Sequence, residues 1–331
     1  MILTFEQIRS ITRGVVRMEE MDGLIHFHRF TKAQYRLYQQ QHTDIFPKAA
    51  STSGVVLEFD TDSRSLFLDT YVTGGDSQRF VCHSIFINGQ PGGQLGDTVP
   101  GKMGSIDIRG SFPLGEGMKR VKICMPWAAN SQLRALILDD GAALIPVQKE
   151  KTVLLFGDSI TQGYEAALPE NTYTSRLTQW LDWNAINKGI GGEIFWPELA
   201  ALSEDFTPDL INVAYGTNDW SVCTFEELEK NCRGFYHNLR KTYPDTKIVM
   251  LSPIWRDDMN REDSACPFRQ VAQLLRETAE QIGNAVLIDC FDFVPPENRC
   301  FCDDLLHPSD EGFRHYAEGL IRCYEALGLN K

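Results

Sequence analysis

The sequence predicts a two-domain chain in which an all-β sandwich precedes a three-layer α/β domain. Short β-rich runs separated by turn residues fill the region from about 54 to 147, whereas strands and helices alternate from 151 onwards. The length of 331 residues fits two domains of roughly 150 residues each. We therefore expect an N-terminal domain at 1–148 and a C-terminal domain at 149–331, joined by a short linker.

The first domain is expected to be a jelly-roll-like sandwich. Runs such as GVVLEFD and SLFLDTYV alternate apolar and polar residues, so two sheets packed together would bury the apolar faces. Ahead of these runs, FEQIRSI and KAQYRLYQQQ are expected to be short helices and GLIHFHRF a strand. The glycine-rich stretch at 89–96 is expected to be a loop, because no helix follows it as in a dinucleotide-binding fingerprint.

The second domain is expected to have a parallel sheet with helices on both faces. Its strands are apolar throughout, which is typical of strands covered on both sides by helical crossovers. The predicted strands are TVLLF, AINKG, DLINVAY, KIVMLSP and AVLIDC. The predicted helices lie at about 171–183, 197–203, 225–241, 264–282 and after residue 307.

The amino-acid composition limits the kinds of partner that the protein can bind. Lys and Arg number 32 against 45 Asp and Glu, and a net charge of −13 disfavours nucleic acid and anionic membranes. No apolar run approaches the roughly 20 residues needed to cross a bilayer. The nine cysteines are odd in number and lack paired CxxC spacing, so we expect reduced thiols and a cytoplasmic location; a secreted form without its leader is the alternative. Composition leaves open whether the protein forms a homo-oligomer.

Two segments suggest nucleophilic catalysis. Ser159 follows the first strand of the second domain, at the sheet edge where ligands bind, and a serine there can attack an acyl carbon. His307 lies in DDLLHP, where Asp304 is close enough to hold the imidazole so that Nε2 can take the serine proton. The alternatives are a Ser159 that only caps a helix and a His307 that is an ordinary surface residue.

Acyl transfer also needs hydrogen-bond donors for the negative charge that develops on the carbonyl oxygen. The next two strands lead into NKGIGGE and AYGTND, which face the same edge. We expect the donors to be the amides of Ser159 and Gly192 and the side chain of Asn218. Gly191 is the alternative to Gly192, and ordinary glycine turns are the alternative for both loops.

These segments, in this order, resemble the SGNH hydrolases, also called GDSL esterases. The resemblance covers about 155–310 and rests on GDSI, the glycine loop, GTND and DLLHP. It implies a metal-independent serine esterase that forms an acyl-enzyme and needs no cofactor. It also implies a catalytic triad of Ser159, Asp304 and His307, and an oxyanion hole of Ser159, Gly192 and Asn218.

A β-sandwich ahead of such a domain resembles carbohydrate esterase family 2 in architecture. This resemblance implies O-acetyl groups on carbohydrates as substrates, in the form of small-molecule or oligosaccharide esters. Aromatic faces suit sugar rings, which makes Trp196, Trp220 and Trp255 candidate substrate contacts, with core packing as the alternative. Acyl transfer to a sugar or small-molecule alcohol is a second hypothesis. A catalytically inactive carbohydrate-binding protein is a third.

Two short stretches contain residue types that can bind metals. His26 and His28 would share one side of a strand, and packing or hydrogen bonding explains them better than a metal. Cys300 and Cys302 lie near His307, but a CxC spacing is not usual for structural zinc. The sequence therefore predicts no metal site.

Overall fold

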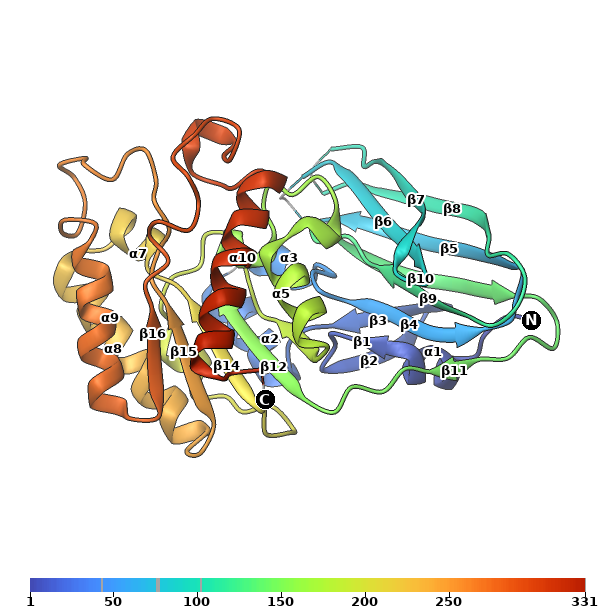
Figure 1. Cartoon of the computed structure of the whole chain (residues 1–331), viewed down its shortest axis with the longest axis horizontal. Coiled ribbons are helices and arrows are strands. Elements are labelled where there is room, and N and C mark those ends of the chain that lie inside the picture. The colour runs from blue at the N-terminus through green and yellow to red at the C-terminus, as the bar shows by residue number, and fades with distance from the viewer. Residues whose placement is uncertain (43, 76–77, 102, 331) are drawn as a thin grey trace. The chain divides into compact units, whose positions relative to one another are not determined.

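The computed structural model describes residues 1–42, 44–75, 78–101 and 103–330, apart from the side chain of residue 304. The chain divides into two compact units, whose elements are labelled in Figure 1. The first unit contains Met1–Thr31, Phe46–Glu150 and Leu168–Glu170, and the second contains Lys32–Ile45, Lys151–Ala167 and Asn171–Lys331. The segment 32–45, which we expected in the 1–148 domain, thus groups with the second unit.

The first unit is built from two antiparallel sheets. One has the order β1 (Thr12–Arg13), β4 (Val56–Thr61), β9 (Lys119–Cys124), β6 (Phe80–Ile87) and β7 (Gln90–Thr98), with β11 (Ile145–Pro146) paired to β4. The other has the order β2 (Arg17–Met21), β3 (Leu24–His28), β10 (Ala129–Leu138), β5 (Ser65–Gly74) and β8 (Ser105–Pro113). Two short helices, α1 (Phe5–Ile11) and α3 (Phe46–Ala49), complete this unit.

The expected alternation of apolar and polar residues explains the core of the first unit. Leu57 and Phe59 of β4 are fully buried, and they share one hydrophobic cluster with Leu68 of the other sheet. The prediction of a loop at 89–96 is wrong, because these residues form most of β7. Among the described residues, β7 pairs with β6 alone and lies at the edge of its sheet, where glycines are tolerated. A bulge interrupts the register of this pair between Ile85 and Phe86 of β6.

The second unit contains the predicted parallel sheet. Its order is β13 (Asn184–Asn187), β12 (Thr152–Gly157), β14 (Leu210–Ala214), β15 (Lys247–Leu251) and β16 (Ala285–Ile288). The helices are α2 (Lys32–Gln41), α4 (Ser159–Gln162), α5 (Tyr173–Leu181), α6 (Pro197–Ala200), α7 (Thr217–Val222), α8 (Phe225–Thr242), α9 (Gln270–Ile282) and α10 (Asp310–Leu327). Two short 3-10 turns lie at Pro169–Asn171, where the chain passes from the first unit to the second after residue 170, and at Asp303–Leu305 in the second.

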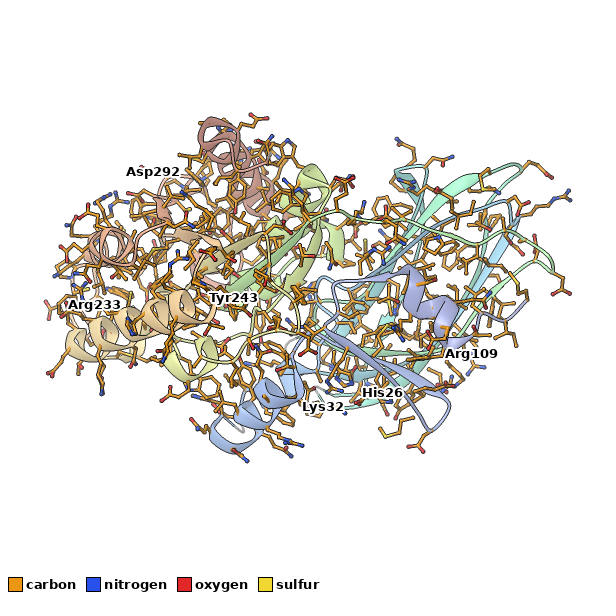
Figure 2. The ribbon with its side chains drawn as sticks, turned by 90° about the horizontal axis from the view of Figure 1, so that it is seen from below. His26, Lys32, Arg109, Arg233, Tyr243 and Asp292 are labelled. Carbon is orange, nitrogen blue, oxygen red and sulfur yellow. The ribbon has the colours of Figure 1, made fainter. Side chains whose placement is uncertain are left out.

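Side-chain alternation along the strands places helices on both faces of this sheet. Phe156 of β12 packs edge-to-face against Phe235 of α8, whose C-terminal end is capped by Tyr243 (Figure 2). On β14, Asn212 is one residue away from the partner of Phe156, so its side chain points to the opposite face, where Tyr324 of α10 donates a hydrogen bond to it. The domain is therefore a three-layer α/β/α sandwich.

The helices predicted at 197–203 and 264–282 are both shorter than expected, and the first ends at Ala200. The predicted 264–282 helix begins only at Gln270, because the backbone before it makes other contacts. The carbonyl of Cys266 accepts a hydrogen bond from the indole N–H of Trp220, and the next residue is Pro267. Within the described ranges, no helix combines the length and the apolar character that crossing a bilayer would demand.

Candidate active site

Ser159 is the first residue of α4, directly after β12. The helix cap is the preceding residue, since the Asp158 carboxylate accepts the amide N–H of Ile160 at 2.9 Å. Ser159 is therefore not the cap, which removes the alternative reading of this residue. Its hydroxyl lies 2.8 Å from Nε2 of His307, a residue 148 positions further along the chain.

His307 is held by a turn of the chain ahead of α10. The backbone N–H of Cys302 donates to the carbonyl of His307 at 2.8 Å, and Phe301 forms a β-bridge with Pro308. On the other side of the ring, Nδ1 lies 2.6 Å from Oδ2 of Asp303. A carboxylate on Nδ1 leaves Nε2 to accept a proton from Ser159, as acyl transfer requires.

The carboxylate beside His307 thus comes from Asp303, one residue before the one we expected. The side chain of Asp304 lies outside the described residues, so its assignment stays a prediction. Asp303 also accepts the backbone N–H of His307 at 3.1 Å through Oδ1. The turn needs unusual backbone angles, with φ of +24° at Asp303 and +60° at Leu305, a region that costs non-glycine residues energy.

In the glycine loop after β13, Gly191 and Gly192 differ in hydrogen bonding and backbone conformation. The amide of Gly191 donates to Oε1 of Gln162 at 2.7 Å, so it is already engaged within the protein. Gly192 has φ of +89°, a conformation that favours glycine. Asn218, at the start of α7, donates from its side-chain amide to the carbonyl of Glu193 at 2.9 Å, so it lies beside this loop.

Two buried carboxylates flank these groups. Burial raises the pKa of Asp158 to about 6 and that of Asp219 to about 7, because the charged form is poorly solvated in the interior. Asp219 accepts the amide N–H of Phe195 at 2.9 Å and so ties the start of α7 to the segment after the glycine loop. Asp158 is the second residue of the GDSI motif and Asp219 is the last residue of GTND, and both accept hydrogen bonds from backbone N–H groups.

The three tryptophans differ in exposure. Trp220 is fully buried, with Arg256 and Arg261 over its ring, so it has no face for a sugar, and core packing explains it. Trp196 is 7% exposed and packs against Tyr38. Trp255 is partly exposed and contacts Phe301 of the His307 turn, which makes it the best placed of the three for a substrate contact.

Tyr164 is a site residue that the sequence analysis missed. Its ring centroid lies 5.3 Å from that of His307. A Cβ atom on Gly191 would come within 2.8 Å of its hydroxyl, so the ring also lines the glycine loop. Only its position five residues after Ser159 could have indicated this.

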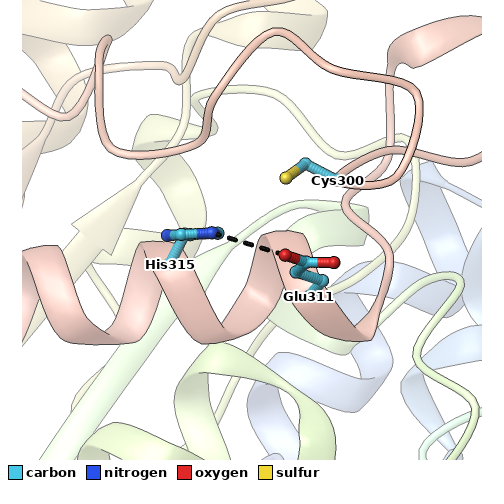
Figure 3. A group of neighbouring side chains, drawn as sticks. All are labelled: Cys300, Glu311 and His315. Atoms are coloured by element: carbon cyan, nitrogen blue, oxygen red, sulfur yellow. Dashed lines mark ion pairs between the residues drawn. The ribbon is translucent and has the colours of Figure 1, made fainter.

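One cluster resembles a metal site in its residue types. Cys300 faces Glu311 and His315, which are one turn apart on α10, with ligand atoms within 4.8 Å of one another (Figure 3). Two arginines compete for the same atoms: Arg299 donates to Glu311 at 2.7 Å, and a guanidinium nitrogen of Arg314 lies 3.1 Å from Nε2 of His315. Because guanidinium groups repel a cation, the cluster is better explained as an ion-pair network.

Comparisons with known proteins concern the family of the second domain and the fold of the chain. Residues 155–315 match the model of the GDSL-like lipase/acylhydrolase family. A comparison with curated protein sequences finds no match.

Several solved structures share the fold over nearly the whole chain. A salicylyl-acyltransferase, SsfX3, from a tetracycline biosynthetic pathway is 24% identical, with a TM-score of 0.77, over 96% of this chain and 94% of that one. A putative GDSL-like lipase from Bacteroides ovatus is 19% identical, with a TM-score of 0.77, over 98% and 97%. A family two carbohydrate esterase from Cellvibrio japonicus is 16% identical, with a TM-score of 0.66, over 96% and 95%.

The family match covers the strands and turns that carry Ser159, Gly192, Asn218 and His307, and the full-length similarities cover the β-sandwich as well. The chain therefore contains a GDSL-like lipase/acylhydrolase domain at residues 155–315, and it shares its two-domain fold with solved structures such as that of a putative GDSL-like lipase.

Proposed function

We propose that the protein removes O-acyl groups, and specifically O-acetyl groups, from carbohydrates through an acyl-enzyme on Ser159. The observation that carries the proposal is the 2.8 Å contact between the Ser159 hydroxyl and Nε2 of His307, with a carboxylate on Nδ1 of the same ring. This arrangement allows the imidazole to act as the general base for the hydroxyl. Fold similarity to family two carbohydrate esterases supports the substrate class.

The reaction follows from the positions of these groups. Ser159 attacks the ester carbon while His307 takes the hydroxyl proton, and the oxyanion is bound by N–H groups of Ser159, Gly192 and Asn218. Collapse of the tetrahedral intermediate breaks the bond to the alcohol, which leaves with the proton from His307. Water, activated by the same imidazole, then hydrolyses the acyl-serine and restores the enzyme.

The test uses Ser159→Ala and a chromogenic acetate ester. We expect kcat to fall about 10⁴- to 10⁶-fold, because triad members act as a unit. Intact-mass spectrometry of the wild type mixed with substrate should show an acetyl adduct that Ser159→Ala lacks. Full turnover by the variant would contradict the proposal. Mass spectrometry of acetylated oligosaccharides then identifies the sugar.

Acyl transfer to an alcohol is the second candidate. It is favoured by one observation, the similarity to a salicylyl-acyltransferase over 96% of the chain. Hydrolysis and transfer share the acyl-enzyme and differ in the acceptor. Product analysis with increasing concentrations of added sugar alcohols separates them: a transferase yields a new ester in preference to the free acid.

A further inference from the structure

We propose that helix α2 positions the oxyanion hole, through the hydroxyl of Tyr38 and the carboxylate of Glu193. The inference rests on the proposed function, since it concerns the geometry of the same acyl-transfer site. Helix α2 precedes most of the sandwich strands in the sequence but belongs to the second unit, and Lys32, labelled in Figure 2, is its first residue.

A buried carboxylate joins α2 to the centre of the domain. Tyr38 is fully buried in α2, and its hydroxyl donates a hydrogen bond to Oε1 of Glu193. From the other side, the hydroxyl of Tyr215, the residue directly after β14, donates to Oε2 of Glu193 at 3.0 Å. Glu193 is 3% exposed, so these bonds are formed in a medium that strengthens them.

Glu193 is directly linked to two of the proposed oxyanion donors. It follows Gly192 in the chain, so moving Glu193 also moves the Gly192 amide. Its backbone carbonyl accepts one N–H of the Asn218 side chain at 2.9 Å. Because that side chain has two N–H groups, this bond fixes its orientation and leaves the second N–H to face the substrate oxygen. A shift of one residue would therefore disturb both donors.

A second polar contact holds the other end of the same loop. Gln34, one turn before Tyr38 on α2, accepts a hydrogen bond from Nζ of Lys188 at 2.9 Å and donates to Glu204 at 2.9 Å. Lys188 and Glu204 form a 2.8 Å ion pair, and both side chains are fully buried. The loop from 188 to 193 is thus fixed to α2 at its two ends, with the oxyanion glycine between them.

This arrangement matters because an oxyanion donor works only over a narrow range of distances, about 2.7–3.1 Å from the developing charge. A loop that carries glycines at 189, 191 and 192 has little stiffness of its own. The hydroxyl of Tyr38 supplies that stiffness from outside the segment 155–315, which contains the family's motifs. Tyr38 and Glu193 are positioning residues and need not touch the substrate.

The experiment removes one buried hydroxyl at a time. Tyr38→Phe deletes the bond to Glu193, and Tyr324→Phe is the matched control, because its hydroxyl is equally buried in the same domain and donates to Asn212, away from the loop. We expect Tyr38→Phe to lower kcat on an acetate ester about tenfold with KM within about twofold, as expected for a defect in transition-state binding. Tyr324→Phe should stay within about twofold in both constants.

A double-mutant cycle separates positioning from general packing. Asn218→Ala alone should cost about 10²- to 10³-fold in kcat, and adding Tyr38→Phe to it should cost less than threefold more, because one of the two donors that Tyr38 helps to place is then gone. Glu193→Gln, which keeps one carbonyl acceptor for the two tyrosines, should lose less activity than Tyr38→Phe combined with Tyr215→Phe.

Three results would overturn the inference. The first is a Tyr38→Phe variant that is as active as Tyr324→Phe. The second is a Tyr38→Phe variant in which KM rises and kcat is unchanged. The third is an effect of Tyr38→Phe on kcat that is as large in the Asn218→Ala background as in the wild type. A wild-type enzyme without ester turnover would instead refute the proposed function. Thermal unfolding of each variant shows that the comparison is made on folded protein.

Discussion

The carboxylate partner of His307 can be identified by a comparison of two neighbouring residues. Asp303 lies 2.6 Å from Nδ1, whereas the spacing of the DLLHP motif favours Asp304. We expect Asp303→Ala to lower kcat/KM much more than Asp304→Ala does. The size of the loss in Asp303→Ala can be worked out from the exposure of the Asp303 side chain.

A charge-assisted hydrogen bond contributes about 1.5–3 kcal/mol. The Asp303 side chain is 45% exposed, so water replaces part of the lost interaction and the lower half of that range applies, about 1.5–2 kcal/mol. At about 1.4 kcal/mol per factor of ten, this corresponds to a loss of about 10- to 30-fold. That is far below the roughly 10⁴-fold effect of a fully buried triad carboxylate.

The assay is steady-state hydrolysis of an acetate ester by Asp303→Ala, Asp304→Ala and the double variant. Asp303→Asn is the control for shape, since its amide oxygen can still accept the Nδ1 proton without the charge, and it should be less impaired than Asp303→Ala. Asp304→Ala should stay within about threefold of the wild type. A larger loss for Asp304→Ala than for Asp303→Ala would refute the reasoning and restore the motif-based assignment.

Three further predictions concern stability and substrate binding. Lys188→Met leaves Glu204 as an uncompensated buried charge, so it should lower the free energy of unfolding, measured by denaturant titration, by about 3–5 kcal/mol. Adding Glu204→Leu should restore much of this stability. A double variant that shows no recovery would contradict this explanation. Burial lowers the pKa of His83 to about 4, below its unfolded value of about 6.5, so the stability from its neutral form is complete above pH 6.5 and is lost as pH falls towards 4. That loss is about 3 kcal/mol, so the free energy of unfolding of His83→Gln should change correspondingly less between these pH values. If the free energy of unfolding depends on pH equally steeply in both proteins, His83 is not the source of the pH dependence. Trp255→Ala should raise KM for an acetylated oligosaccharide several-fold and leave KM for a small acetate ester unchanged, whereas equal effects on both would indicate a packing role.

The sequence predicts the parallel sheet well because its signal is local. Each strand is an apolar run buried on both faces, and all five predicted runs form strands. The same reasoning fails for β7, whose glycines resemble a loop, because an edge strand needs few apolar side chains. Strand prediction is thus most secure where burial is greatest.

In the candidate site, too, the sequence predicts only those features that have a local signal. Ser159 and His307 can be paired from their places at strand and turn ends, but the choice between Asp303 and Asp304 depends on backbone angles within one turn, which spacing does not determine. The role of Tyr38 has no local signal at all, because the residue it contacts is 155 positions away. Contacts of this kind are found only from coordinates.

The distance along the chain between α2 and its partners affects how the protein is made. Gln34 is synthesised 154 residues before Lys188, which at about 5–20 residues per second means a delay of about 8–30 s on the ribosome. A helix of 10 residues is barely stable in water by itself, so α2 should stay unfolded during that interval while neighbouring strands of the nascent sandwich can already pair. Completion of the proposed oxyanion hole is therefore a late event in synthesis, and it depends on a segment that leaves the ribosome early.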